Sequence, residues 1–283
     1  MGDPSKEPFR TINAALREWR QGDVILDVDL PLYHLAIAGQ PLTDEAGLAS
    51  QEQPESNPDD LILVAGKCPG FIVLTQTCDL VRCSTIRPYA ELAALVEVEP
   101  NFLRQVEKCY RPAYTFVPAL ADKRLVADLS RVMTVEKAVL ASFKRQPGLR
   151  STKEITAFQQ ALARYKSRFA FPDDFNDALA DFQERLKKRA GKNSEEGQHV
   201  EALAEIRVIA QPDWYAEKVS IVLWFIKNRD PEPENWLRWI NEWTSLIDQK
   251  GKYLVENAQV VRPEDMRVSE YLESQRLDLD HLS

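Results

Sequence analysis

The sequence predicts an α+β protein, with a β-rich region first, a helical segment in the middle and a second mixed region at the C-terminus. Three patterns predict it. Roughly six or seven short β-forming runs lie between residues 23 and 130, helical spacing of apolar residues begins near residue 134, and a β-β-α-β order closes the chain. Short strands separated by turn residues are typical of a small barrel or a strongly bent sheet.

The chain of 283 residues is long enough for about two domains, and we expect four parts. Residues 1–20 hold an N-terminal helix, residues 21–130 the β-rich barrel, residues 131–190 a helical segment and residues 191–283 a C-terminal α+β domain. Residues 38–60, inside the barrel, are rich in Gly, Pro, Ser, Asn, Gln and acids. This composition predicts a long, mobile surface loop.

The elements of the first half are short and bounded by turn residues. A helix is predicted over residues 8–19, because Pro8 suits its first position and the apolar residues that follow have helical spacing. Residues 66–70 are expected to form a turn between two strands. The predicted strands are residues 24–30, 61–65, 71–74, 90–97, 114–117 and 124–129, with a short helix at 101–109.

The second half begins with helices and ends with a β-β-α-β order. Ser151 to Glu154 form a capping box that starts one helix, and Pro172 with two aspartates starts the next. Residues 187–197 are predicted to be a polar linker. Strands are then predicted at residues 205–210, 219–227 and 252–261, with helices at 234–249 and 268–274.

Composition restricts the partners of this protein. The net charge is −8, with 44 acidic and 36 basic residues, which argues against broad adhesion to nucleic acid but leaves room for a local basic patch. No apolar run approaches the ~20 residues that cross a bilayer, and the N-terminus has no apolar signal core. We therefore expect a cytoplasmic protein without membrane contact. No nucleotide-loop or metalloprotease motif occurs, and no cofactor is expected.

The candidate functional centre is the stretch Gly70 to Leu80. An apolar run, Phe71–Leu74, leads directly into polar residues, which is how a buried strand delivers side chains to a site at its end. The candidate catalytic residues are Cys78 and Asp79, and the candidate binding residues are Gln76, Thr77, Arg82 and Arg87.

The chemistry of Cys78 has two interpretations. A thiolate nucleophile needs a base or a cation that lowers its pKa, and Arg82 or Arg87 would have to supply the cation, because the neighbouring Asp79 has the opposite effect. In the alternative interpretation, Cys78 is a small structural residue, and Thr77 and Asp79 form hydrogen bonds in the turn after the strand.

The four cysteines do not form a metal-binding pattern. Cys68, Cys78, Cys83 and Cys109 would be enough thiolates for a tetrahedral zinc site, but their intervals of 10, 5 and 26 residues give only one close pair, Cys78 and Cys83, whereas a zinc site of this kind is built from two such pairs. No metal is therefore expected. Because no export signal is evident, structural disulfides are not expected either.

Two other groups of residues have both a structural and a functional interpretation. Arg164, Lys166 and Arg168 precede two phenylalanines and could hold phosphates beside a stacked base, although cations in a last helical turn also offset the helix dipole. Five of the six tryptophans lie in the C-terminal domain. Those at 236, 239 and 243 share one helical face, which suits packing on a sheet or a protein interface.

Two resemblances follow from these motifs. The stretch Gly22-Asp23-Val24-Ile25, followed after a loop by residues 67–74, resembles the MazF/PemK-type toxins, which implies an SH3-like barrel over residues 21–130 and RNA cleavage. The chain as a whole resembles a family of bacterial proteins that share Thr75-Gln76-Thr77-Cys78-Asp79-Leu80, the stretch 168–175 and the ending 277–283. The second resemblance implies no activity, but it supports the choice of Cys78 and Asp79.

The leading functional hypothesis is a protein that contacts RNA, DNA or a nucleotide in a bacterial toxin-like or phage-defence system, with a ribonuclease-type effector as its enzymatic form. One alternative is a non-catalytic subunit that binds a protein partner through the Trp-rich C-terminal domain. Another alternative is a cysteine-dependent hydrolase that uses Cys78.

Overall fold

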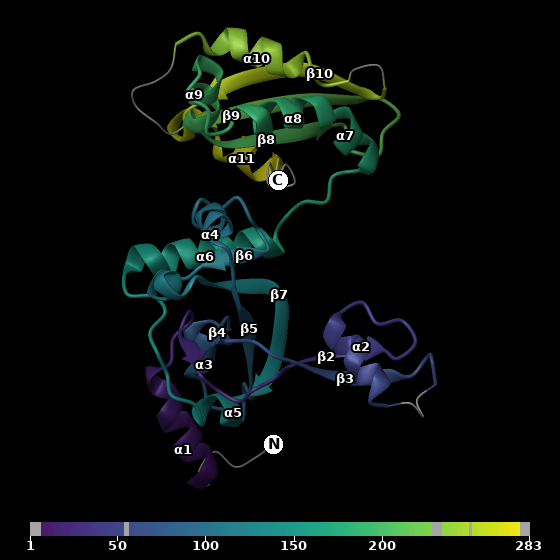
Figure 1. The fold of residues 1–283 in the computed structure, drawn as a ribbon. Coiled ribbons are helices and arrows are strands. Elements are labelled where there is room, and N and C mark those ends of the chain that lie inside the picture. Colours follow the sequence, from purple (N-terminus) through teal and green to yellow (C-terminus); the bar gives the residue numbers. More distant parts are fainter. Residues whose placement is uncertain (1–6, 54–56, 228–233, 249–250, 278–283) are drawn as a thin grey trace. The chain divides into compact units, whose positions relative to one another are not determined.

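The computed structural model describes residues 7–53, 57–227, 234–248 and 251–277 (Figure 1). The chain divides into two compact units, Met1–Lys166 (unit 1) and Ser167–Ser283 (unit 2). Both units combine helices with sheets, so the α+β class is confirmed. None of the helices in the described ranges combines the length and the apolar character of a membrane span.

Unit 1 is built on an open five-stranded antiparallel sheet with the order β1-β4-β5-β7-β6. The edge strands β1 and β6 do not pair with each other in the described residues, so the predicted barrel is not closed. The register shifts between Ala93 and Ala94, whose partners on β7 are Val132 and Asp128. These extra residues on β7 bend it sharply (Figure 1), because unpaired insertions increase strand curvature. The strands are β1 (Val24–Leu26), β4 (Gly70–Val73), β5 (Tyr89–Glu97), β6 (Tyr114–Phe116) and β7 (Leu125–Glu136).

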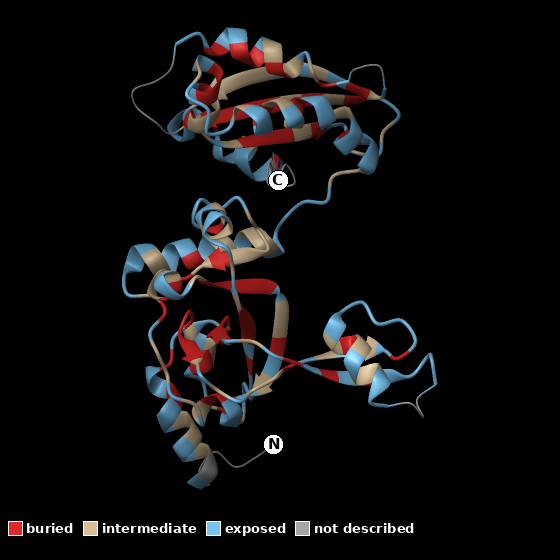
Figure 2. Ribbon diagram, in the orientation of Figure 1, coloured by how far each residue is buried: buried red, intermediate tan, exposed pale blue. Residues whose placement is uncertain are grey.

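Strand β4 is buried along its whole length, and Figure 2 draws much of the sheet around it in red. Phe71 and Val73 of β4 pack on one side with Trp19, while Ile72 packs on the other side with Phe158. A strand buried on both faces needs a continuous apolar run, which is why residues 71–74 do not alternate. Around the sheet lie α1 (Glu7–Ala15), η1 (Leu16–Glu18), α3 (Thr77–Leu80), α4 (Pro100–Glu107), η2 (Pro118–Lys123), α5 (Lys137–Ala141) and α6 (Thr152–Lys166).

A separate antiparallel ribbon in unit 1 consists of β2 (Leu32–Ile37) and β3 (Leu61–Gly66). The expected turn at residues 66–70 therefore connects two different sheets rather than two paired strands. The predicted loop at 38–60 contains a helix, α2 (Asp44–Gln51). The Thr43 hydroxyl accepts a hydrogen bond from the Ala46 amide at 3.1 Å and so caps the start of α2. This capping residue was overlooked because the segment has the polar composition of a loop.

Unit 2 contains a four-stranded sheet with the order β10-β9-β8-β11. Strands β8 (Leu203–Gln211) and β9 (Val219–Lys227) are antiparallel, and α10 (Trp236–Thr244) crosses over to β10 (Tyr253–Val261), which is parallel to β9. The elements follow the predicted β-β-α-β order, but the short edge strand β11 (Gln275–Leu277) was not predicted. The tryptophans at 236, 239 and 243 are buried, so their stripe packs within unit 2.

The boundaries of the middle segment differ from the prediction of a helical segment at 131–190. Residues 131–136 continue β7, and residues 167–190 belong to unit 2. The predicted linker at 187–197 includes the start of another helix, which the Ser194 hydroxyl caps. The remaining helices of unit 2 are α7 (Asp173–Ala178), α8 (Ala180–Arg189), α9 (Glu195–Ala202), η3 (Pro263–Asp265) and α11 (Val268–Glu273). The ending 278–283 lies outside the described residues.

Candidate functional site

A pocket of about 1010 Å³ opens at the end of β4, entirely within unit 1. Its walls come from the segment after β4, from α3, from the start of β5 and from β7 and α6. Its size is at the upper end of the range of ligand pockets. The pocket thus lies where the sequence predicted a site.

The pocket contains five of the six predicted site residues. Gln76, Cys78 and Arg87 are exposed, and Thr77 and Asp79 are partly buried. Arg82 is not part of the pocket lining. Its guanidinium lies 3.2 Å from the Asp79 carboxylate, in an ion pair that is open to solvent. Arg82 is therefore a partner of Asp79 rather than a pocket residue.

Threonines and a buried glutamine fix the backbone after β4. The Thr75 hydroxyl accepts from the Glu91 amide at 2.7 Å, and the Thr77 hydroxyl accepts from the Gln21 amide at 3.1 Å. The Gln21 side chain donates to the Leu74 carbonyl at 2.7 Å. These bonds hold the polar stretch in place and leave the neighbouring Gln76 and Cys78 side chains directed to the pocket lining.

Lys137 is a buried lysine that bonds to the backbone at the end of α3, and the sequence analysis did not predict this role. Its side chain is only 1% exposed, and its ammonium donates to the carbonyls of Asp79 and Arg82 at 2.6 and 2.9 Å. Burial lowers the pKa of Lys137, although the Asp79 carboxylate acts in the opposite direction. No sequence signal predicts the burial of this lysine, because lysines ordinarily lie at the surface and its burial depends on contacts with distant residues.

The thiol of Cys78 makes one weak contact among the described residues. Its only hydrogen-bond partner within the described part of the chain is the Gln76 side-chain oxygen, at 3.6 Å. Cys78 is a free cysteine whose side chain is exposed to solvent. The pKa of the Cys83 thiol is lowered, mainly by its hydrogen bond with the Thr85 side chain at 3.2 Å. Cys83 does not line the pocket.

Several pocket residues were missed by sequence reasoning because they come from distant elements. Tyr89 and Glu91 stand at the start of β5, and Gln159 and Tyr165 lie on α6. Lys166 also lines the pocket, with its ammonium 5.4 Å from the Tyr165 ring centroid. The basic end of this helix is evident in the sequence. Its position beside β4 depends on tertiary packing.

Asp23, which belongs to the Gly22–Ile25 motif, has a structural position. Its carboxylate accepts from the Arg20 amide at 2.6 Å and lies 3.2 Å from the Arg145 guanidinium. Burial raises the pKa of Asp23, and these partners counteract the rise. Gly22 has φ 86°, and a β-carbon there would lie 2.2 Å from Leu149 Cδ1, so this turn requires glycine.

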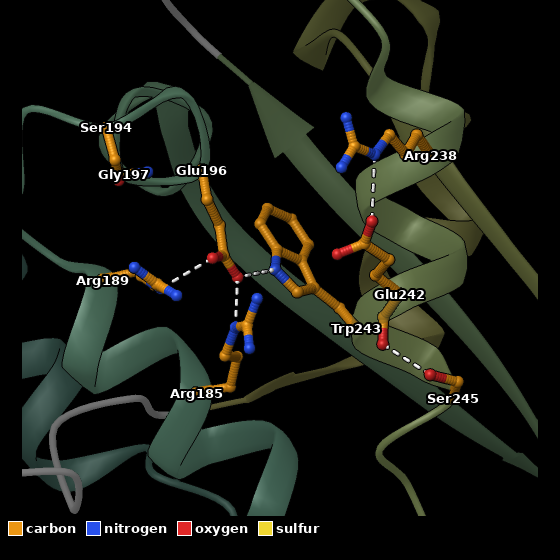
Figure 3. A network of polar contacts seen from close by, with 9 residues as sticks. All are labelled: Arg185, Arg189, Ser194, Glu196, Gly197, Arg238, Glu242, Trp243 and Ser245. Atoms are coloured by element: carbon orange, nitrogen blue, oxygen red, sulfur yellow. Dashed lines mark hydrogen bonds and ion pairs between the residues drawn. The ribbon is translucent and has the colours of Figure 1, made fainter.

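A second polar cluster lies in unit 2 and is closed (Figure 3). The buried Glu196 carboxylate accepts hydrogen bonds from Arg185 at 2.7 Å and from the Trp243 indole at 3.0 Å, and it pairs with Arg189 at 2.7 Å. Burial alone would raise the pKa of Glu196, but the bonds from Arg185 and Trp243 outweigh burial and lower it. The nearby Arg238–Glu242 pair is exposed.

The described residues contain no group of three or more His, Cys, Asp or Glu side chains that could hold a metal ion. Comparisons of the chain with protein-family models, with curated proteins and with solved structures found no match.

Proposed function

We propose that unit 1 binds single-stranded RNA or DNA, or a nucleotide, in the pocket at the end of β4. The observation that supports this proposal is the combination of groups in one pocket. Arg87 and Lys166 are cations, Tyr89 and Tyr165 are aromatic rings, and the pocket is about 1010 Å³ in volume. Cations that neutralise phosphates beside rings that stack bases are the usual elements of single-strand recognition.

The remaining pocket groups suit contacts to bases and sugars. The amide of Gln76 is exposed and can both donate to and accept from a base edge. The carboxylates of Asp79 and Glu91 accept only, so they suit base amino groups or sugar hydroxyls and repel phosphate. Arg82 offsets the charge of Asp79 from outside the pocket.

The wider proposal concerns the setting and the reaction. We propose that the bent open sheet is an SH3-like variant and that the protein acts in a bacterial toxin-like or phage-defence system. Asp79 or Glu91 would be the proton acceptor in a ribonuclease-type reaction at the 2′-hydroxyl. Incubation of end-labelled RNA with the wild type, Asp79→Asn and Glu91→Gln tests this reaction. Intact RNA with all three proteins would contradict cleavage but not binding.

Binding itself is tested by fluorescence anisotropy with labelled single strands of about 12 nucleotides. Two phosphate contacts predict that affinity falls roughly sevenfold for a fourfold rise in salt concentration. Arg87→Ala with Lys166→Ala should weaken binding about tenfold or more and flatten this salt dependence. Lys108→Ala, which removes an exposed cation outside the pocket, is the matched control. Absence of binding, or equal effects of both changes, would refute the proposal.

A further inference from the structure

The outer face of the β2–β3 ribbon is a continuous apolar surface. Tyr33, Leu35 and Ile37 on β2 are 45%, 66% and 40% exposed, and Leu61 and Leu63 on β3 are 69% and 60% exposed. Leu35 pairs with Leu63 and Ile37 pairs with Leu61 in the antiparallel register. Because cross-strand partners point to the same face, the five side chains form one patch. We refer to these five side chains as the ribbon face.

The opposite face of the ribbon is buried against α2 and the residue that follows β2. Ile62 and Val64 pack there with Ala46 of α2 and with Ala38. This alternation is strict in both strands, so the ribbon face cannot turn inward without exposing the buried set. The buried set is small, and an isolated two-stranded ribbon is marginally stable in water. A cover on the ribbon face would therefore contribute substantially to its stability.

The ribbon face is large enough to form an interface. Five side chains of this size and exposure present roughly 500 Å² of apolar surface, which is the scale of the largest patches on monomeric proteins and often marks an interaction site. Two such faces in contact would bury about 1000 Å² in total, the lower limit of a specific protein interface.

We infer that the ribbon face binds the same face of a second copy of this chain. The face contains no charged side chain, so it offers nothing to the charges of an ionic partner. An isologous contact needs a patch that is complementary to itself, and an uncharged face of leucine, isoleucine and tyrosine meets that condition. The small area predicts a dimer with a micromolar dissociation constant, on the order of 1 to 100 μM.

Sedimentation velocity of the full chain between about 1 and 200 μM tests the inference. The wild type should change from monomer to dimer over this range. Leu35→Lys with Leu63→Lys should weaken dimerisation at least ~100-fold, because it would place four charges in the interface. The control Leu237→Lys with Leu272→Lys changes two leucines of unit 2 that are 75% and 73% exposed, and it should dimerise as the wild type does.

Folding of the variants is checked by circular dichroism, and the milder pair Leu35→Ser with Leu63→Ser adds no charge. We expect this milder pair to weaken dimerisation at least tenfold with an unchanged spectrum. A wild type that stays monomeric at the highest concentration would overturn the inference. A dimer that both pairs of substitutions leave intact would overturn it as well.

Discussion

The pocket of unit 1 and the closed cluster around Glu196 in unit 2 both contain polar and charged side chains. They differ in whether these side chains are bonded within the chain or exposed. In unit 2 the Glu196 carboxylate is fully occupied by Arg185, Arg189 and Trp243 (Figure 3). In unit 1 the side chains of Gln76 and Arg87 are exposed at the pocket. A buried polar group whose bonds are all made within the chain stabilises the fold, whereas exposed groups around a cavity are available to a ligand.

The same contrast exists within unit 1, between the pocket and the layer beneath it. Lys137 and Gln21 are buried and bond to backbone carbonyls, so they position the polar stretch. Gln76 and Arg87 line the pocket over this layer and are exposed. Substitutions in the lower layer should change stability and binding together, and substitutions in the upper layer should change binding alone.

The largest effect on stability is expected for Glu196→Ala. Loss of the carboxylate leaves Arg185, Arg189 and the buried Trp243 indole without their partner. Because both arginines are partly exposed, the expected loss is about 2–3 kcal/mol, less than for a fully buried pair. Denaturant unfolding followed by tryptophan fluorescence measures it, since five of the six tryptophans lie in unit 2.

Glu242→Ala is the matched control for this prediction. The Arg238–Glu242 pair is an exposed i,i+4 pair on α10, and its loss should change the free energy of unfolding by less than about 0.5 kcal/mol. Equal losses for Glu196→Ala and Glu242→Ala would contradict the structural role of the closed cluster.

A smaller effect is expected for Lys137→Met. The change removes the two bonds from the lysine ammonium to the carbonyls of Asp79 and Arg82, but it also relieves the burial of a charge. We expect a net loss of about 1–2 kcal/mol, together with weaker RNA binding because α3 loses its support. Circular dichroism melting and anisotropy measure both. Unchanged values of both would show that Lys137 does not position the pocket.

The free energy of unfolding of unit 2 should also depend on pH through the ionisation of Glu196. Its pKa in the folded state is lowered below the ordinary value of 4.5, so its contribution is fully present above about pH 4.5 and is lost as the pH falls through the folded-state pKa. Glu196→Gln should remove this part of the pH dependence. A wild type and a variant with parallel stability curves down to about pH 3 would disprove the assignment.

The smallest effect is expected for Cys78→Ser. The thiol is exposed, and its only hydrogen-bond partner in the described residues is Gln76. Stability should change by less than about 0.5 kcal/mol, and RNA affinity should stay within about twofold of the wild-type value, which is less than a single good contact contributes. Complete loss of binding or of an RNA-cleaving activity would show that the thiol takes part in the chemistry.

Local patterns in the sequence predicted much of the fold. The uninterrupted run Phe71–Leu74 predicted a strand that delivers residues to a site, and Gln76 to Asp79 do line the pocket. The capping signals of the helix at 152–166 are local, and so are the apolar runs that predicted the C-terminal strands. Such elements depend on neighbours in sequence, which is why they were predictable.

The remaining features depend on contacts between distant segments. The position of Lys166 beside β4, the burial of Lys137 and the separation of β3 from β4 into different sheets have no local signal. The prediction of a closed barrel was wrong for the same reason, because the pairing partners of the edge strands β1 and β6 depend on tertiary contacts that leave no local signal. The helix at 44–51 was missed because its composition is that of a loop.

The most direct test of the contrast between the open pocket and the closed cluster is one titration of labelled single-stranded RNA against three proteins. These are the wild type, Gln76→Ala with Arg87→Ala, and Arg189→Ala. We expect the pocket variant to lose about tenfold or more in affinity, because it lacks a phosphate contact and a base contact, and the Arg189 variant to bind as the wild type does. The opposite order, or equal affinities for all three proteins, would contradict the assignment of the pocket as the binding site.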